Sequence, residues 1–248
     1  MSLDPRRAAL WQAMNLGPQW VLRRAPGAAL PGDQQAAAAV SEPPAADERQ
    51  RVIAAMGWDE LQAAVAGCTA CGLCRSRTQT VFGVGSRAAR WMIVGEAPGA
   101  EEDARGEPFV GQAGRLLDNM LEAIGRSRQA DAARPVFIAN VLKCRPPGNR
   151  NPQPEEVASC EPFLLRQMAL VQPTLVLVMG RFAAQSVLRS EAPVSALRGR
   201  VHRLHIGGRD VPAVVTYHPA YLLRNLADKA KAWADLCLAL DLDEGAES

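Results

Sequence analysis

Residues 91–95 read WMIVG, a short apolar run that ends in glycine and leads into the polar turn EAPG. A continuous apolar run of this length is typical of a strand that is buried on both faces of a sheet. Three further runs of this kind follow, and helical patterns separate them. The apolar runs are WMIVG (91–95), VFIAN (136–140), TLVLVMG (174–180) and VPAVVTYHP (211–219), and the helical patterns are GRLLDNMLEAIG (114–125), PEEVASCEPFLLRQMALV (154–171), FAAQSVL (182–188) and a last one near 222–241. This alternation predicts an α/β fold in which helices cover both faces of a parallel sheet.

The carboxyl ends of these strands carry polar and Gly/Pro-rich sequences. They read GEAPG (95–99), Asn140, GR (180–181) and YHP (217–219). Parallel α/β proteins bind their ligands at this end of the strands. We therefore predict that the functional site lies there.

The chain has 248 residues, with 28 basic and 26 acidic side chains and a formal net charge of +2. This length allows one domain with a sizeable core and an appendage. No apolar run approaches the roughly 18 residues of a membrane span, and the segment MSLDPRRAALWQAMNLG lacks the apolar core of a signal peptide. We therefore expect a cytoplasmic protein without a membrane partner. The near-neutral charge gives no support by itself for a nucleic-acid partner.

The first fifty residues differ in composition from the rest. Residues 1–25 concentrate large apolar side chains, and residues 26–50 are rich in Ala, Pro, Gln and Gly without an apolar period, which is typical of a linker. We expect residues 1–25 to pack on the main domain, with the docking of a protein partner as the alternative. The main domain is assigned to residues 51–248. Its first helix is predicted at about 58–66, where Gly67 ends it.

The chain contains six cysteines: Cys68, Cys71, Cys74, Cys144, Cys160 and Cys237. In a reducing cytoplasm, clustered cysteines indicate metal binding or redox activity more often than disulfides. One CxxC pair precedes the first strand, and a second pair brackets the loop after the second strand, so two distant loops can close a site of four thiolates. Spacing alone does not separate zinc from an iron–sulfur cluster. Cys74 could compete as a ligand but is favoured as a bystander, and Cys237 is predicted to be a small core residue.

Four motifs stand in order along the chain: CTACGLCRSRTQTVFGVG (68–85), GEAPGAEEDARGEPFVGQAG (95–114), IANVLKCRPPGNRNPQPEE (138–156) and YHPAYLLR (217–224). Together they resemble the family 4 uracil-DNA glycosylases, the iron–sulfur branch of that superfamily, over about residues 58–242. The resemblance implies a three-layer α/β/α sandwich with a central four-stranded parallel sheet. It also implies a [4Fe–4S] cluster held by Cys68, Cys71, Cys144 and Cys160.

The resemblance and the chemistry of uracil together assign roles within these motifs. An enzyme that acts on uracil in DNA flips the nucleotide into a pocket, where the Phe109 ring would lie against the base and the small Ala97 beside it. Asn140 would offer its carbonyl to N3–H and its amino group to O4, a pattern that cytosine reverses. His218 would donate to O2, where negative charge develops as the glycosidic bond breaks.

The residue that positions or activates water stays open at this point. The candidates are Glu96, Glu102 and Asn149. Glu102 is alternatively placed near uracil C5, where it would exclude the methyl group of thymine.

DNA contacts are predicted from residues that flank these motifs. Arg145, Arg150 and Arg224 are candidates for phosphate contacts. Leu222 and its neighbour Leu223 are candidates to wedge into the base stack, and their alternative role is the first turn of the final helix.

The resulting hypothesis is a monomeric hydrolase of base excision repair, acting at the bacterial nucleoid. It releases free uracil from single- or double-stranded DNA and leaves an abasic site. One alternative is an iron–sulfur protein that captures uracil-DNA covalently without turnover. That branch carries a basic, histidine-containing loop, and RPPGNRNPQPEE (145–156) has no histidine. The other alternative, a non-enzymatic DNA-binding accessory module, is disfavoured by the set of Phe109, Asn140 and His218.

Overall fold

The computed structural model describes residues 48–244. The segment 1–25 and most of the predicted linker lie outside these residues, so their predicted roles stay predictions. The last three residues assigned to the linker begin helix α2 (Glu48–Ala55). In the described part of the chain, no helix has the length and apolar character needed to cross a membrane.

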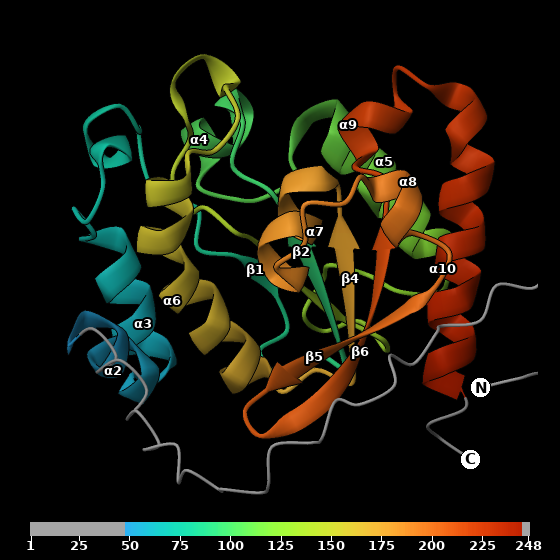
Figure 1. Cartoon of the computed structure of the whole chain (residues 1–248), viewed down its shortest axis with the longest axis horizontal. Helices are drawn as coiled ribbons and strands as arrows, with labels where there is room; N and C mark the ends of the chain where they lie inside the picture. Colours follow the sequence, from blue (N-terminus) through green and yellow to red (C-terminus); the bar gives the residue numbers. More distant parts are fainter. Residues whose placement is uncertain (1–47, 245–248) are drawn as a thin grey trace, which may run out of the picture. The chain divides into compact units, whose positions relative to one another are not determined.

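A six-stranded sheet forms the centre of the described domain (Figure 1). Its strands are β1 (Val84–Gly85), β2 (Trp91–Gly95), β3 (Val136–Asn140), β4 (Leu175–Met179), β5 (Val201–Ile206) and β6 (Arg209–Thr216). The order across the sheet is β1-β3-β2-β4-β6-β5. The four central strands are parallel, which confirms the predicted four-stranded parallel sheet. β1 and β5 add an antiparallel strand at each edge.

The helices that follow α2 are α3 (Trp58–Ala66), η1 (Gly72–Arg75), α4 (Ala100–Arg105), α5 (Gly111–Ala123), η2 (Pro147–Asn149), α6 (Pro154–Val171), α7 (Arg181–Leu188), α8 (Val194–Leu197), α9 (Pro219–Leu222), η3 (Leu226–Asp228) and α10 (Lys229–Glu244). The helices predicted at about 58–66, 114–125, 154–171 and 182–188 correspond to α3, α5, α6 and α7, and the short helices η1, α4, η2 and α8 were not predicted. The prediction of a single helix near 222–241 is wrong, because the backbone leaves the helical region at Asn225 (φ −127°, ψ 74°). The chain therefore forms α9 and η3 before α10 begins.

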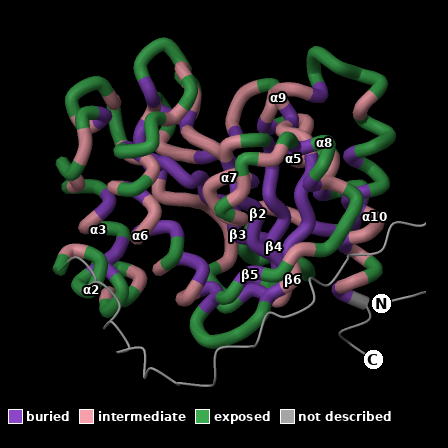
Figure 2. The backbone as a smooth tube through the Cα atoms, in the orientation of Figure 1, coloured by how far each residue is buried: buried purple, intermediate pink, exposed green. Residues whose placement is uncertain are grey.

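Alternate strand residues face opposite helical layers, as the pleat of a strand requires. On β2, Met92 and Val94 belong to the apolar cluster formed with α6, α7 and α8. Trp91 and Ile93 belong to the cluster formed with α5 and α10. β2, β3 and β4 are buried along their whole length (Figure 2). The three-layer α/β/α sandwich is confirmed.

A third apolar cluster is formed by α2, α3, η1 and part of α6. Its buried members include Ile53, Leu61 and Phe163, together with Cys144 and Cys160. α2 and α3 lie beside α6 in Figure 1, and both contact it. This cluster packs the segment that contains Cys68 and Cys71 against α6, the helix that follows the loop after β3.

Candidate functional site

The loops after the four parallel strands line one cleft of about 880 Å³. The predicted site residues that line it are Glu96, Ala97, Glu102, Phe109, Asn140, Asn149, Arg150, His218 and Arg224. Side chains to which the sequence assigned no role also line it, and they include Arg181, Phe182, Val194, Tyr217 and Tyr221. Segments that are far apart in the chain thus meet at the edge of the sheet where the sequence placed the site.

Asn140 ends β3 and presents an unpaired acceptor to this cleft. Its side chain is 2% exposed, and Oδ1 has no hydrogen-bond partner within the described residues. A buried polar atom without a partner is costly, so such an atom points to a ligand that supplies the missing donor. Gly95 lies opposite on the neighbouring strand, and a Cβ at that position would overlap this oxygen. The amide of Asn140 is therefore held close to the backbone of β2.

Phe109 lies in the cleft with a strained backbone. It is buried, and its φ of +52° falls in the left-handed region that side chains other than glycine rarely adopt. Its ring stacks on the His218 imidazole, with 5.2 Å between ring centroids and 25° between the planes. Strain of this kind persists only where surrounding contacts hold it.

His218 is the N-cap residue of α9, and its geometry fixes which ring nitrogen carries the proton. Nδ1 accepts a hydrogen bond from the Ala220 main-chain N–H at 3.1 Å. Burial, with a smaller contribution from the positive charge of Arg224, lowers the pKa of His218 to about 4. At neutral pH the imidazole is uncharged, and the proton lies on Nε2. The ring is therefore a neutral hydrogen-bond donor.

Glu96 follows β2 directly and lines the cleft. Burial raises the pKa of Glu96 to about 7, although the positive charge of Arg181 acts in the opposite direction. A carboxyl group that titrates near neutral pH can accept a proton from water more readily than an ordinary exposed glutamate.

Glu102 and Asn149 are placed differently. One carboxylate oxygen of Glu102 accepts from Gly99 N–H at 3.0 Å, and the other accepts from Val110 N–H at 3.0 Å. Each oxygen of the Glu102 carboxylate thus binds one backbone amide, so this carboxylate ties two loops together, and its role toward water stays a prediction. Asn149 is exposed, and its Oδ1 accepts from Arg145 Nε at 2.7 Å.

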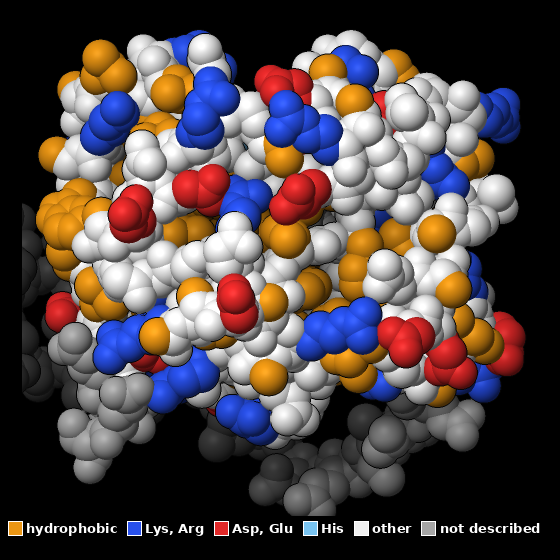
Figure 3. Space-filling view, turned by 180° about the vertical axis from the view of Figure 1, so that it is seen from behind, with side chains coloured by type: hydrophobic (Ala, Val, Ile, Leu, Met, Phe, Trp, Pro, Cys, Tyr) orange, Lys and Arg blue, Asp and Glu red, His pale blue; other side chains and the backbone are white. Residues whose placement is uncertain are grey.

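The residues predicted to contact DNA differ in their exposure and in their ion pairs. Leu222 is 1% exposed, so the prediction that it wedges into DNA is wrong, whereas Leu223 is 38% exposed. Arg150 makes a bidentate pair with Glu156, at 2.9 Å and 2.5 Å, so its charge is already balanced. Arg224 lines the cleft, and Arg145 lies beside it through its bond to Asn149. On the face turned away in Figure 1, basic and acidic side chains are interspersed (Figure 3).

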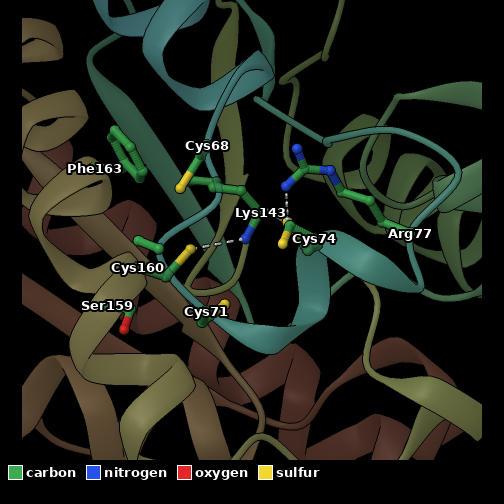
Figure 4. Close-up of a pocket in the computed structure, with 10 residues that line it drawn as sticks. Cys68, Cys71, Cys74, Arg77, Lys143, Ser159, Cys160 and Phe163 are labelled. Carbon is green, nitrogen blue, oxygen red and sulfur yellow. Dashed lines mark hydrogen bonds between the residues drawn. The ribbon is translucent and has the colours of Figure 1, made fainter.

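The four predicted metal ligands line a second, smaller cavity together with Cys74. Figure 4 shows Cys68, Cys71, Cys74 and Cys160 among the residues that line this cavity, with the Arg77 guanidinium directed toward the cysteines. Arg77 Nη1 donates to Cys144 Sγ at 3.1 Å, and the Lys143 main-chain N–H donates to Cys160 Sγ at 3.3 Å. All six cysteines are free of disulfides. Within residues 48–244, no group of three or more His, Cys, Asp or Glu side chains is arranged to hold a single metal ion.

Lys143 connects this cavity to the cleft. Its side chain is buried, and Nζ donates to the Asn140 main-chain oxygen at 2.7 Å and to Gln167 Oε1 at 2.6 Å. Burial lowers the pKa of Lys143 to about 8, while the thiols of Cys160 and Cys144 favour its charged form. A buried ammonium between neutral oxygens is stabilised by nearby negative charge. Burial raises the pKa of Cys160 to about 12 and also raises that of Cys144, so these residues would supply negative charge only as metal-bound thiolates.

The fold and these side chains define a three-layer α/β protein with a cleft of mixed polar and apolar lining at the carboxyl ends of its parallel strands. Residues 82–237 match the sequence model described as "Uracil DNA glycosylase superfamily". This match covers more than half of the chain, and the protein belongs to that superfamily.

Several similar proteins bear the name Type-4 uracil-DNA glycosylase, and three of them follow. The protein from Archaeoglobus fulgidus is 42% identical over 169 residues, which cover 66% of this chain and 82% of the relative. The one from Thermotoga maritima is 42% identical over 165 residues, with the same two coverages. The one from Pyrobaculum aerophilum is 38% identical over 187 residues, which cover 74% of this chain and 93% of the relative.

Proposed function

We propose that this protein is a DNA-repair glycosylase that flips uracil out of DNA and hydrolyses its N-glycosidic bond. Its membership of the uracil-DNA glycosylase superfamily and its Type-4 relatives support this function. The single observation that carries it is the buried, unpaired Oδ1 of Asn140 at the cleft. The products are free uracil and an abasic site.

Uracil is selected by the Asn140 amide. Oδ1 accepts from uracil N3–H, and the side-chain NH₂ donates to O4. Cytosine has an acceptor at N3 and a donor at N4, so the same amide would meet two mismatched groups. A buried mismatch leaves polar atoms unpaired, which is the strongest means of rejecting a near-isostere.

The leaving group is stabilised by His218. As the bond between the sugar and N1 breaks, the electron pair goes to the base and negative charge develops on O2. The neutral His218 ring donates its Nε2–H to that oxygen. The Ala220 N–H on Nδ1 keeps the ring proton on Nε2. Phe109 provides the flat apolar surface on which the base lies.

Water is positioned by Glu96 in this proposal. Of the three candidates, Glu102 is occupied by two backbone amides and Asn149 lies on the exposed side, bound to Arg145. Glu96 lines the cleft with a carboxyl group that ionises near pH 7. Because the uracil anion is stabilised separately, a base of moderate strength is sufficient.

We propose that Cys68, Cys71, Cys144 and Cys160 hold a [4Fe–4S] cluster, which the resemblance to the Type-4 proteins supports. The four cysteines line one cavity, and thiolates are ligands of iron–sulfur clusters. The N–H donors from Arg77 and Lys143 are suited to thiolates. When bound, the cluster supplies negative charge and a rigid link between the two loops.

The test is a multiple-turnover assay with excess oligonucleotide that contains one uracil, followed by alkali and by chromatography of the free base. Release of several equivalents of uracil supports the enzyme, and an identical oligonucleotide with thymine in that position is the control. An alkali-stable protein–DNA adduct would support the covalent binder instead. Protein that contains one cluster per chain but releases no uracil would refute the proposed function.

A further inference from the structure

Arg128 lies outside the cleft lining, in the segment between α5 and β3, but its guanidinium reaches the backbone of the Phe109 loop. Nη1 donates to the Pro108 carbonyl at 3.0 Å, and Nη2 donates to the Phe109 carbonyl at 2.9 Å. Nε donates to Asp118 Oδ1 on α5 at 2.6 Å. Only 11% of the Arg128 side chain is exposed. One planar group thus holds two consecutive carbonyls while a carboxylate fixes its orientation.

The two carbonyls belong to the part of the loop that needs external support. Phe109 has a φ of +52°, a conformation that is unfavourable for a phenylalanine. On the amide side of the loop, Val110 N–H donates to Glu102. On the carbonyl side, Gly114 approaches the Phe109 carbonyl so closely that a Cβ would overlap it. Arg128 therefore provides the hydrogen bonds on the side that Glu102 does not reach.

We propose that Arg128 is a positioning residue, which sets the Phe109 ring against His218 and thereby fixes the site of the flipped base. This inference rests on the proposed function, because it assigns the stacked ring to the uracil pocket. The ring centroids of Phe109 and His218 are 5.2 Å apart, so a change in the Phe109 backbone would alter both the stacking surface and the packing around the O2 donor.

Replacement of Arg128 by lysine tests the hydrogen bonds separately from the charge. It retains the positive charge that faces Asp118, but a single ammonium lacks the planar fork that reaches two carbonyls and a carboxylate together. The pair with Asp118 contributes little by itself, because the Asp118 side chain is 47% exposed. Arg128→Lys therefore separates the ion pair from the hydrogen bonds to the loop. Arg87→Lys is a matched control, since Arg87 pairs with Asp59 at 3.0 Å on an exposed surface.

The experiment compares wild type, Arg128→Lys, Arg128→Met and Arg87→Lys as cluster-containing proteins. Three quantities are measured: the single-turnover rate of uracil excision, inhibition by free uracil, and amide hydrogen exchange of peptides that contain residues 106–114. For both Arg128 variants we expect faster exchange in these peptides, weaker inhibition by uracil and a rate about 100-fold lower, since misplacement by about 1 Å has an effect of this size. Arg87→Lys should match wild type in all three.

Thermal unfolding separates positioning from a general loss of structure. A variant whose Tm falls while its uracil inhibition and loop exchange stay at wild-type values would overturn the proposal, because Arg128 would then only stabilise the fold. Unchanged loop exchange in Arg128→Met would overturn it as well. If wild type itself releases no uracil, the proposed function fails, and the exchange data alone decide whether Arg128 holds the Phe109 loop.

Discussion

Gly95 is the last residue of β2, and the structure predicts that a single methyl group there disrupts the pocket. A Cβ at this position would overlap Asn140 Oδ1 and lie 2.5 Å from Cζ and 2.6 Å from Cε2 of the Phe109 ring. Ordinary van der Waals contact requires both side chains to move by about 1 Å, and a misplacement of this size lowers activity about 100-fold. Asn140 and Phe109 are both buried, so the movement is opposed by their other neighbours. We expect overpacking to cost about 1–3 kcal/mol, or about 2–10 °C in Tm for a domain of this size.

The assay compares Gly95→Ala with Gly57→Ala. At Gly57 the added methyl meets Glu60 Oε2 at 3.7 Å, an ordinary contact, and the site is remote from the cleft. Uracil excision under single-turnover conditions and thermal unfolding are measured on both variants. Loss of activity in Gly95→Ala with a folded, cluster-containing protein supports the placement of Asn140 and Phe109. If Gly95→Ala excises uracil within about threefold of wild type, a difference of less than 1 kcal/mol in the barrier, the pocket is not where this geometry puts it.

Four further predictions follow from the same side chains. Asn140→Asp should lower uracil excision about 10–100-fold and reduce the preference for uracil over cytosine, measured on matched oligonucleotides, because the donor to O4 is lost. The excision rate should rise through about pH 7 as Glu96 ionises, and a pH profile of Glu96→Gln should lack this rise. Because the pKa of His218 is lowered to about 4 in the folded state, stability should fall as the pH drops from about 6.5 to about 4, by up to ~3 kcal/mol, and urea unfolding of His218→Gln should lack this dependence. Lys143→Met leaves two buried oxygens without their donor, so urea unfolding should show a loss of about 2 kcal/mol or more, and iron analysis should show a lower content per chain.

The central sheet was predictable because each of its parallel strands is a short apolar run with a polar end. The edge strands gave weaker signals for physical reasons. β5 reads VHRLHI, in which only one face is buried, so polar and charged side chains interrupt the apolar pattern. β1 has only two residues. The final helix was predicted as one element because its apolar residues continue past the break, which depends on the backbone of Asn225.

The cleft was predictable only where a motif places a side chain at the end of a strand. Asn140 and His218 are such residues, Phe109 belongs to the motif that follows β2, and all three line the cleft. Arg128 carries no local signal, since its role depends on carbonyls about twenty residues earlier in the chain. For Leu222 and Leu223, the sequence does not indicate which side chain is exposed. They are chemically alike and adjacent, and only the packing of α9 decides that Leu222 is buried while Leu223 is exposed.

The segment that leaves β3 gives the proposed metal cluster a structural role in a hydrolase, which transfers no electrons. Three residues separate Asn140 from Cys144, and they lie outside helices and strands. Their backbone is held by neighbours: Val141 N–H donates to the Gly95 carbonyl at 2.9 Å, and Leu142 N–H donates to the Glu96 carbonyl at 3.0 Å. The Lys143 ammonium then returns to the Asn140 carbonyl. A metal cluster bound at Cys144 would limit the movement of Asn140 through a few covalent bonds and one buried charge. In the proposed function, the cluster would thus contribute to base selection without taking part in the reaction.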